Sequence, residues 1–252
     1  MATAPTAVLT QREPELLDQT VVVIGGSSGI GLETARRARV EGANVILVGR
    51  DPERLKQAAL DVDAQRTATV DANDPTALNA FFHDLPSPAD HVMVTAGAPH
   101  YGSPLTIPPE EARRGFSEHL MLVLDVARAA AGKVRPPGTL IFMDGTGGRR
   151  PSVGTGIAST VTVATPTLIA NLALELAPIR VNLIAAGFVD TPLSASILGH
   201  DLDKRRAQLR ATLPIRRVVG PADIAALAVH IMSNTALTGA TYDIDGGQQL
   251  VE

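Results

Sequence analysis

Three glycines at a fixed spacing form the clearest chemical pattern in the sequence. Gly25, Gly29 and Gly31 follow the apolar run 20–24 and precede a helical pattern. In this context the first glycine permits a tight turn, the second lets backbone approach a pyrophosphate, and the third allows close helix packing. The free N–H groups at a helix N-terminus also favour phosphate. We therefore predict a nucleotide phosphate site, rather than a plain glycine turn, built from Gly25, Ser27, Ser28, Gly29, Ile30 and Gly31.

The end of the next apolar run indicates which nucleotide is bound. Sites that select NAD place an acid there to bind the ribose hydroxyls, but this sequence has Gly49 followed at once by Arg50. A guanidinium can bond a 2′-phosphate with charge assistance and can stack on adenine. We therefore predict NADP(H), with NAD(H) as the less favoured cofactor. The alternative is that Arg50 is a solvated surface cation beside Asp51 and Glu53.

Alternating strands and helices must position these residues. Short β-branched runs predict strands at Thr20–Ile24, Asn44–Val48, Thr67–Val70, His91–Thr95, Thr139–Met143, Arg180–Ile184 and Thr241–Asp245. Helical patterns lie between them at Gly29–Glu41, Pro52–Leu60, Pro75–Asp84, Pro109–Ala131, Pro166–Ala177 and Pro221–Ser233. This alternation predicts one Rossmann-type, doubly wound α/β domain with a seven-stranded parallel sheet. We expect the domain at 18–252, after an N-terminal extension 1–17, with a lid insertion at 191–214.

The composition excludes several classes of protein. Of the 252 residues, 45% are hydrophobic and 19% are charged, so a sizeable core can form. The net charge of −4 and the aromatic content of 3% indicate neither a basic surface nor a stacking surface for nucleic acid. The sequence has 0 cysteines, which excludes disulfides and a cysteine nucleophile. The 6 histidines include no His-x-x-x-His pair, so we expect no metal site.

The same sequence indicates where the protein works. No apolar run reaches the about 18–20 residues of a membrane span, and residues 1–11 show no secretory pattern. We therefore expect a cytoplasmic protein that acts on a small molecule and has neither a nucleic-acid nor a membrane partner.

Further motifs resemble those of the short-chain dehydrogenase/reductase (SDR) family, whose glycine loop has the same spacing. Thr95-Ala96-Gly97 stands where the family has Asn-Ala-Gly, and Gly187–Pro192 resembles its nicotinamide loop. Leu174–Asn182 and Leu237–Gly247 match its later helix and strands. The resemblance implies the SDR strand order and a homodimer or homotetramer built on the fourth, fifth and last helices. It also assigns cofactor contacts to Asp71, Ala96, Gly97, Gly187, Val189 and Thr191.

Asp71 has a second interpretation. In the family this acid contacts the adenine amino group. Alternatively, Asp71 is an acidic residue at the N-terminus of the helix predicted from Pro75.

At the positions where the family has its catalytic residues, this sequence has different residues. In the family a Tyr donates a proton, a Lys lowers the pKa of that Tyr, a Ser polarises the substrate oxygen and an Asn supports a water chain. Counted from the matched motifs, the Tyr, Lys, Ser and Asn positions fall on Ala158, Thr162, Gly145 and His119. The only tyrosines, Tyr101 and Tyr242, have no Lys four or seven residues later. The resemblance therefore supports the fold and the nucleotide site more than the reaction.

Three residues are candidates to replace the missing proton donor. Tyr101 follows the Thr95-Ala96-Gly97 turn and is either an acid or a packing residue of the pocket wall. His119 is either a proton donor or a polar helix residue. Asp144 ends a strand at the edge where ligands collect, and could be a base, an anchor for a substrate amine or a turn cap.

Two questions stay open from sequence alone. The β-branched stretch 158–165 before Pro166 is either part of a kinked continuous helix, which we favour, or lies ahead of a helix capped by Thr165. The protein is either an NADP(H)-dependent oxidoreductase with a non-standard active site, reducing an activated carbonyl, imine or quinone-like acceptor, or a catalytically silent NADP(H)-binding sensor or partner subunit.

Overall fold

The sheet of this computed structural model, which describes residues 12–251, has seven parallel strands in the order β3-β2-β1-β4-β5-β6-β7. The strands are β1 Thr20–Ile24, β2 Asn44–Gly49, β3 Arg66–Thr69, β4 Ala89–Val94, β5 Val134–Gly145, β6 Arg180–Ala186 and β7 Thr241–Ile244. The predicted doubly wound α/β domain is confirmed. Most strand ends lie within two residues of the prediction, but β5 begins at Val134 rather than Thr139.

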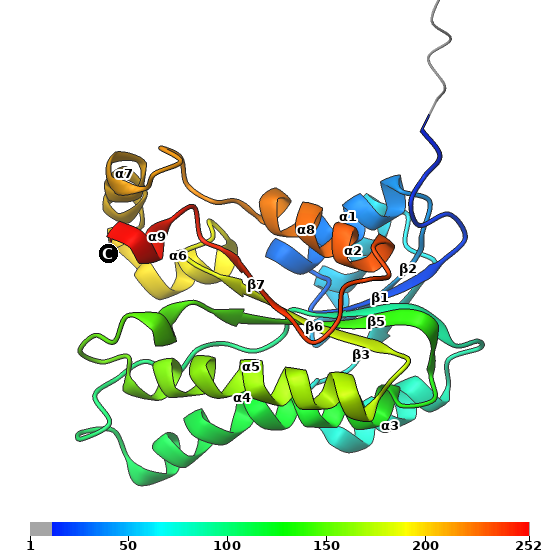
Figure 1. Ribbon diagram of the computed structural model, residues 1–252, viewed down its shortest axis with the longest axis horizontal. Helices are drawn as coiled ribbons and strands as arrows, with labels where there is room; N and C mark the ends of the chain where they lie inside the picture. The colour runs from blue at the N-terminus through cyan, green and yellow to red at the C-terminus, as the bar shows by residue number, and fades with distance from the viewer. Residues whose placement is uncertain (1–11, 252) are drawn as a thin grey trace, which may run out of the picture.

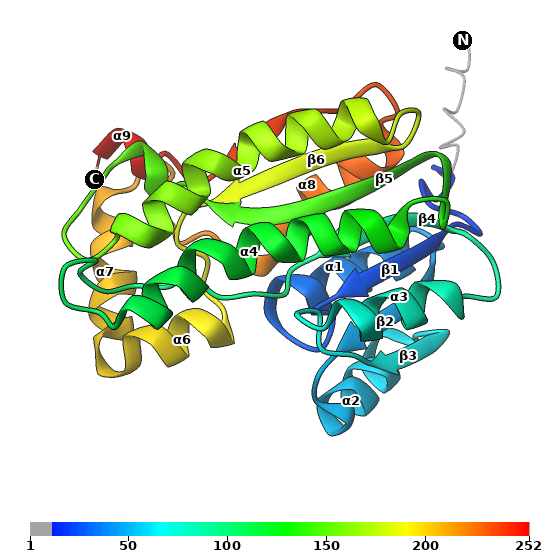
Figure 2. The ribbon, with the colours of Figure 1, turned by 90° about the horizontal axis from the view of Figure 1, so that it is seen from below.

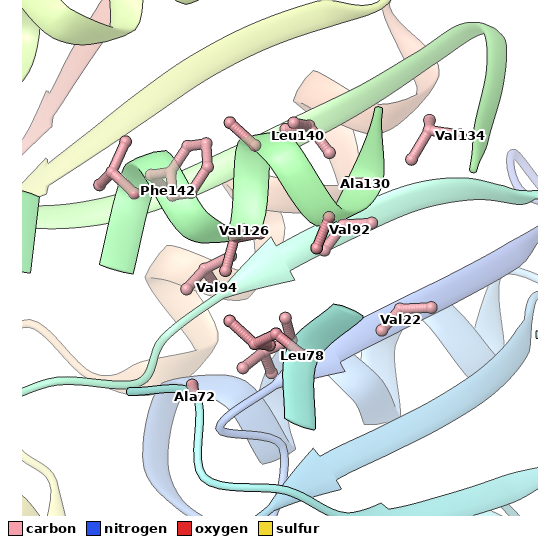
Figure 3. Packing of buried hydrophobic residues seen from close by; sticks show 14 of the residues in the cluster. Val22, Ala72, Leu78, Val92, Val94, Val126, Ala130, Val134, Leu140 and Phe142 are labelled. Carbon is pink, nitrogen blue, oxygen red and sulfur yellow. The ribbon is translucent and has the colours of Figure 1, made fainter. Parts of the chain in front are cut away.

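Both faces of the sheet are covered by helices, as Figure 1 shows. The central strands β1, β2, β4 and β6 therefore read as nearly continuous apolar runs, because most of their side chains are buried on one face or the other. In β1, Val22 and Ile24 join the cluster on one face, and Val21 and Val23 join the cluster on the opposite face. Figure 3 shows the first cluster, where side chains from β4 and β5 meet those of the helices beneath.

The helices divide between these faces. On the face seen in Figure 2 lie α3 Pro75–His83, α4 Pro109–Ala130 and α5 Gly156–Glu175. The opposite face carries α1 Gly29–Val40, α2 Pro52–Val62 and α8 Pro221–Ser233. Proline stands in the first turn of α2, α3, α4 and α8, and the Asp51 and Asp74 carboxylates cap α2 and α3.

Helix α5 runs without interruption through Pro166. The continuous alternative is therefore correct, and a helix that starts near Pro166 with Thr165 as its cap is wrong. The Thr165 hydroxyl instead donates to the carbonyl of Val161, one turn earlier. Ile157, Val161 and Ile169 are buried along the same face, so packing overrides the poor helix propensity of the β-branched stretch.

By length and composition α5 could cross a membrane, with a mean hydropathy of 1.5. The expectation that no segment reaches this length is therefore wrong. Its buried residues pack against β5, β6 and α4, and a core helix of a folded domain passes the same test. The helix is thus weak evidence for a membrane span.

The segment after β6 carries the insertion predicted as a lid at 191–214. It holds α6 Pro192–Leu198 and α7 Leu202–Thr212, which are joined by a short 3-10 turn at Gly199–Asp201. The Arg206 guanidinium of α7 makes two hydrogen bonds to the Asp190 carboxylate, at 2.9 and 2.7 Å. Of the predicted extension 1–17, residues 1–11 lie outside the described residues, while Leu16 is fully buried in the core.

Buried polar groups gather at the N-terminal edge of the sheet. The Arg180 guanidinium donates to the carbonyls of Ile231, Met232 and Asn234, and so satisfies the last turn of α8. His91 is only 3% exposed and its Nε2 lies 2.7 Å from Oε1 of Gln19. Burial, together with the positive charge of Arg180, lowers the pKa of His91 to about 3.

Acidification should therefore destabilise the fold through His91. The unfolded chain takes up this proton near pH 6.5 and the folded protein only near pH 3, so stability falls as the pH drops through this window. Lowering the pH from about 6 to about 4.5 should lower the free energy of unfolding by up to about 2 kcal/mol through this group. Urea unfolding of His91→Gln at several pH values should show a flatter dependence. His83→Gln, at a side chain 82% exposed, should leave the dependence unchanged.

Candidate active site

The predicted phosphate loop lies where the strand order reverses, between β1 and β4. Gly25 and Gly29 have φ of +89° and +54°, which favour glycine. A Cβ built on Gly31 would lie 2.3 Å from the Gly25 carbonyl oxygen and 2.6 Å from Oγ1 of Thr95. Ser28 precedes the first turn of α1, so the free N–H groups of that turn face this loop. Ser27 lies in the turn ahead of α1, and Ile30 lies in the first turn of the helix. Gly31 is thus required by its close contact with the Gly25 backbone, and Gly25 and Gly29 are favoured by their positive φ, as in a dinucleotide cradle.

The loop after β6 closes the other side of this cradle. A Cβ on Gly29 would lie 3.6 Å from Cβ of Thr191, so the predicted nicotinamide loop 187–191 reaches the phosphate loop. Val189 pairs with Val219 in an isolated bridge. The structure therefore brings together two groups of predicted cofactor residues that are far apart in sequence.

The C-terminal helix α9, Gln248–Val251, supports the nicotinamide loop and was missed by sequence reasoning. The Phe188 N–H donates to Oε1 of Gln248 at 2.8 Å. A Cβ on Gly187 would lie 2.6 Å from Cβ of Asp245 and 2.7 Å from Oε1 of Gln248. The only sequence signal was the Asp245-Gly246-Gly247 turn ahead of this helix.

Arg50 lies exposed at the end of β2, and it makes no hydrogen bond or ion pair with residues 12–251. Its neighbour Asp51 is engaged in capping α2. A Cβ on Gly49 would lie 3.5 Å from Oγ of Ser27, so the phosphate loop and the end of β2 adjoin. This corner combines a free cation and a hydroxyl with no competing acid at Gly49.

The remaining cofactor candidates are Asp71 and Gly97, which are exposed, and Ala96, which is partly buried against the core. Asp71 accepts a hydrogen bond from the Asn73 N–H at 3.0 Å through Oδ1, so part of its carboxylate shapes a local turn. Ala96 and Gly97 follow β4, and Gly97 has a φ of +107°.

His119 of α4 and Asp144 of β5 meet at the C-terminal edge of the sheet. Nε2 of His119 lies 3.6 Å from Oδ2 of Asp144, and the two side chains are 20% and 9% exposed. Both atoms are buried and have no hydrogen-bond partner among the described residues. The other Asp144 oxygen accepts the Gly145 N–H at 2.7 Å. Nδ1 of His119 faces the turn after β4, 3.6 Å from a Cβ built on Gly97.

The third candidate, Tyr101, is separate from this pair. Its side chain is 55% exposed, and it makes no hydrogen bond or ion pair with residues 12–251. Desolvation of its buried part raises the pKa of Tyr101, which makes the phenol a poorer acid. His100, beside it, is bound to Glu118 at 2.8 Å.

The positions that the resemblance assigns to the family's Ser and Lys are neighbours in space. A Cβ on Gly145 would lie 3.6 Å from Cγ2 of Thr162. The Thr162 hydroxyl donates to the Ser159 carbonyl at 2.9 Å, and a Cβ on Gly148 would lie 2.6 Å from that hydroxyl oxygen. The loop backbone thus packs directly on α5 at this point. Ala158, one turn earlier, offers no hydrogen-bonding side chain.

No group of three or more His, Cys, Asp or Glu side chains that could hold an ion occurs in residues 12–251.

The fold and the cradle define a Rossmann-type dinucleotide-binding protein. The family model described as "Enoyl-(Acyl carrier protein) reductase" matches residues 24–249. The chain is 29% identical over 257 residues to the short-chain dehydrogenase/reductase ATR9 of Stachybotrys chlorohalonatus, an alignment that covers 93% of this chain and 98% of ATR9. The chain belongs to the short-chain dehydrogenase/reductase family of oxidoreductases.

Solved structures agree with this assignment. The MalC reductase/Diels-Alderase from Malbranchea aurantiaca superimposes with a TM-score of 0.87 at 23% identity, covering 94% of this chain and 99% of that one. A small-chain dehydrogenase in complex with NADPH gives a TM-score of 0.79 at 26% identity, over 92% of this chain and 99% of the other. The first shows the fold, and the second is a protein of the same fold that was solved in complex with NADPH.

Replacing Gly31 by Ala should disrupt the cradle. The added methyl would overlap the Gly25 carbonyl, so we expect a loss of about 1–3 kcal/mol in stability and a marked loss of NADPH affinity. Thermal unfolding and calorimetric titration measure the two effects. Gly220→Ala is the matched control, because a Cβ there meets nothing within 4 Å. Normal NADPH binding by Gly31→Ala would contradict the assignment of the loop.

Proposed function

We propose that the chain is an NADP(H)-dependent oxidoreductase with a non-standard active site, which transfers hydride between the cofactor and an activated carbonyl, imine or quinone-like acceptor. The observation that carries this proposal is the glycine cradle at the β1–β4 switch point, closed by Thr191 against Gly29. When bound, the cofactor supplies a hydride at the C-terminal edge of the sheet.

We propose the following roles for the cofactor residues. Backbone N–H groups of 25–31 bind the pyrophosphate, and Arg50 with Ser27 binds the 2′-phosphate. Asp71 meets the adenine through its second oxygen. The turn at Ala96-Gly97 and the loop at Gly187, Val189 and Thr191 hold the nicotinamide half. The NADPH complex of a related dehydrogenase supports the choice of NADP(H) over NAD(H).

His119 and Asp144 are the proposed polar centre of the reaction. Oδ2 of Asp144 lies 3.6 Å from Nε2 of His119, and Nδ1 of the same ring lies toward the turn after β4. This pair can serve in two ways: His119 can deliver a proton, or the buried carboxylate can stabilise a cation. Tyr101 is the weaker candidate, because burial raises its pKa and no Lys or Arg among residues 12–251 is bonded to it.

We also propose a homodimer or homotetramer. Phe116, Met121 and Val163 are 42%, 42% and 60% exposed on α4 and α5, on the side away from the sheet. Light scattering at several concentrations tests this proposal, and a monomer at all of them would contradict it.

Substitution of Arg50 should change cofactor choice. Arg50→Ala should weaken NADPH by about 10–100-fold and NADH by much less, because only NADPH carries the phosphate that the guanidinium binds. Calorimetric titration with both cofactors measures the ratio. Arg37→Ala, which removes an exposed cation from α1, is the control. Equal losses for both cofactors would refute the 2′-phosphate role.

The reaction itself is tested by stopped-flow absorbance. NADPH should bind the purified protein, and mixing with a panel of ketones, iminium ions and quinones should oxidise it in at least one case. If NADPH binds and no acceptor oxidises it, the protein is instead a silent NADP(H)-binding protein. If neither NADPH nor NADH binds, both the oxidoreductase hypothesis and the hypothesis of a silent NADP(H)-binding protein are wrong.

A further inference from the structure

The acceptor end of the proposed site contains a carboxylate and lacks the usual donors. The Asp144 carboxyl is 9% exposed, and one of its oxygens is buried without a hydrogen-bond partner. Among residues 12–251, the one ionisable group within ion-pair distance is His119, at 3.6 Å. No Lys or Arg in this part of the chain is paired with it. A buried carboxylate with an unsatisfied oxygen is costly, which points to a cationic ligand.

A carbonyl acceptor suits this environment poorly. Its reduction builds negative charge on oxygen, which needs a hydrogen-bond donor. Gly145 and Ala158 offer no such side chain, and the Thr162 hydroxyl is already bonded to Ser159. The remaining candidate donor, His119, has its Nε2 beside the Asp144 carboxylate. The carboxylate of Asp144 would repel the developing charge.

A cationic carbon–nitrogen double bond suits it well. The hydride supplied by the cofactor forms the new C–H bond, and the π pair of C=N⁺ becomes the nitrogen lone pair, so the products are a neutral amine and the oxidised cofactor. No proton is taken up. One unit of positive charge is present before and after the transfer, so a fixed carboxylate is favourable throughout.

We propose that Asp144 makes the acceptor subsite selective for iminium ions, and that this is the substrate class of the enzyme. The inference rests on the proposed function, because it needs a nicotinamide cofactor in the cradle. It also gives a physical reason why Gly145, Ala158 and Thr162 can stand where the family has its hydroxyl donors and lysine: an iminium acceptor needs neither a proton nor an oxyanion donor.

Binding tests the charge preference without any turnover. The probes are the N,N-dimethyl tetrahydroisoquinolinium cation and its neutral carbon analogue, titrated into NADPH-saturated protein at about pH 8.5, where free histidine is neutral. The cation should bind at least about tenfold more tightly than the neutral analogue. Asp144→Asn should abolish this preference and leave NADPH affinity unchanged. Glu118→Gln, which removes a half-exposed carboxylate next to His119 in sequence, should keep it.

Kinetics supply a second readout that does not depend on a variant. The N-methyl dihydroisoquinolinium ion should oxidise NADPH at least about 10²-fold faster than β-tetralone, a neutral ketone of similar shape. The hydride step should show a primary isotope effect with deuterated NADPH and none in D₂O. Faster reduction of the ketone, or equal binding of the two probes, would overturn the iminium proposal while NADPH oxidation upheld the oxidoreductase. Failure of NADPH to bind would overturn both.

Discussion

The close packing of Gly31 against Gly25 and Thr95 is the contact on which the cofactor cradle depends. Oγ1 of Thr95 lies 3.2 Å from the carbonyls of Ile24 and Gly25, and so joins the ends of β1 and β4 at the switch point of the sheet. The first turn of α1 can lie against these strand ends only because Gly31 has no side chain. This contact places the free N–H groups of the helix over the opening between the strands. The loop after β6 then meets the same turn through Gly29 and Thr191, which completes the cradle from opposite ends of the sequence.

The proposed acceptor side of the site is organised differently. In the family to which the chain belongs, the resemblance places hydroxyl donors and a lysine there. Here the backbone at Gly148 packs directly on α5, against Thr162 and Val163. The remaining polar groups are the histidine and carboxylate of the pair His119–Asp144, contributed by α4 and β5. The cradle thus depends on backbone geometry, whereas the proposed acceptor half of the site depends on buried ionisable side chains.

The sequence was sufficient for the features that depend on local pattern. Buried strands such as Val21–Ile24, the glycine loop and the helix starts at Pro52 and Pro75 are each encoded within a few residues. The start of α5 was not predictable locally, because β-branched residues and Pro166 argue against a helix that packing against the sheet enforces.

The sequence also did not predict which candidate side chains lie next to each other. His119 and Asp144 stand on separate elements, and only the packing of α4 on β5 brings them together, while Tyr101 is left outside. The support that Gln248 gives to Phe188 spans 60 positions, and no local pattern signals it.

The bond between Gln248 and Phe188 has a practical consequence. This bond joins the C-terminal helix to the backbone of the predicted nicotinamide loop, and Asp245 and Gln248 fill the space beside Gly187. An affinity tag or fusion partner attached after α9 would disturb the conformation of that backbone. One attached ahead of Arg12 would enter at the opposite, amino edge of the sheet, where Glu15 and Leu16 are bonded to Glu41. Expression vectors for this protein should therefore carry their appendage at the front of the chain.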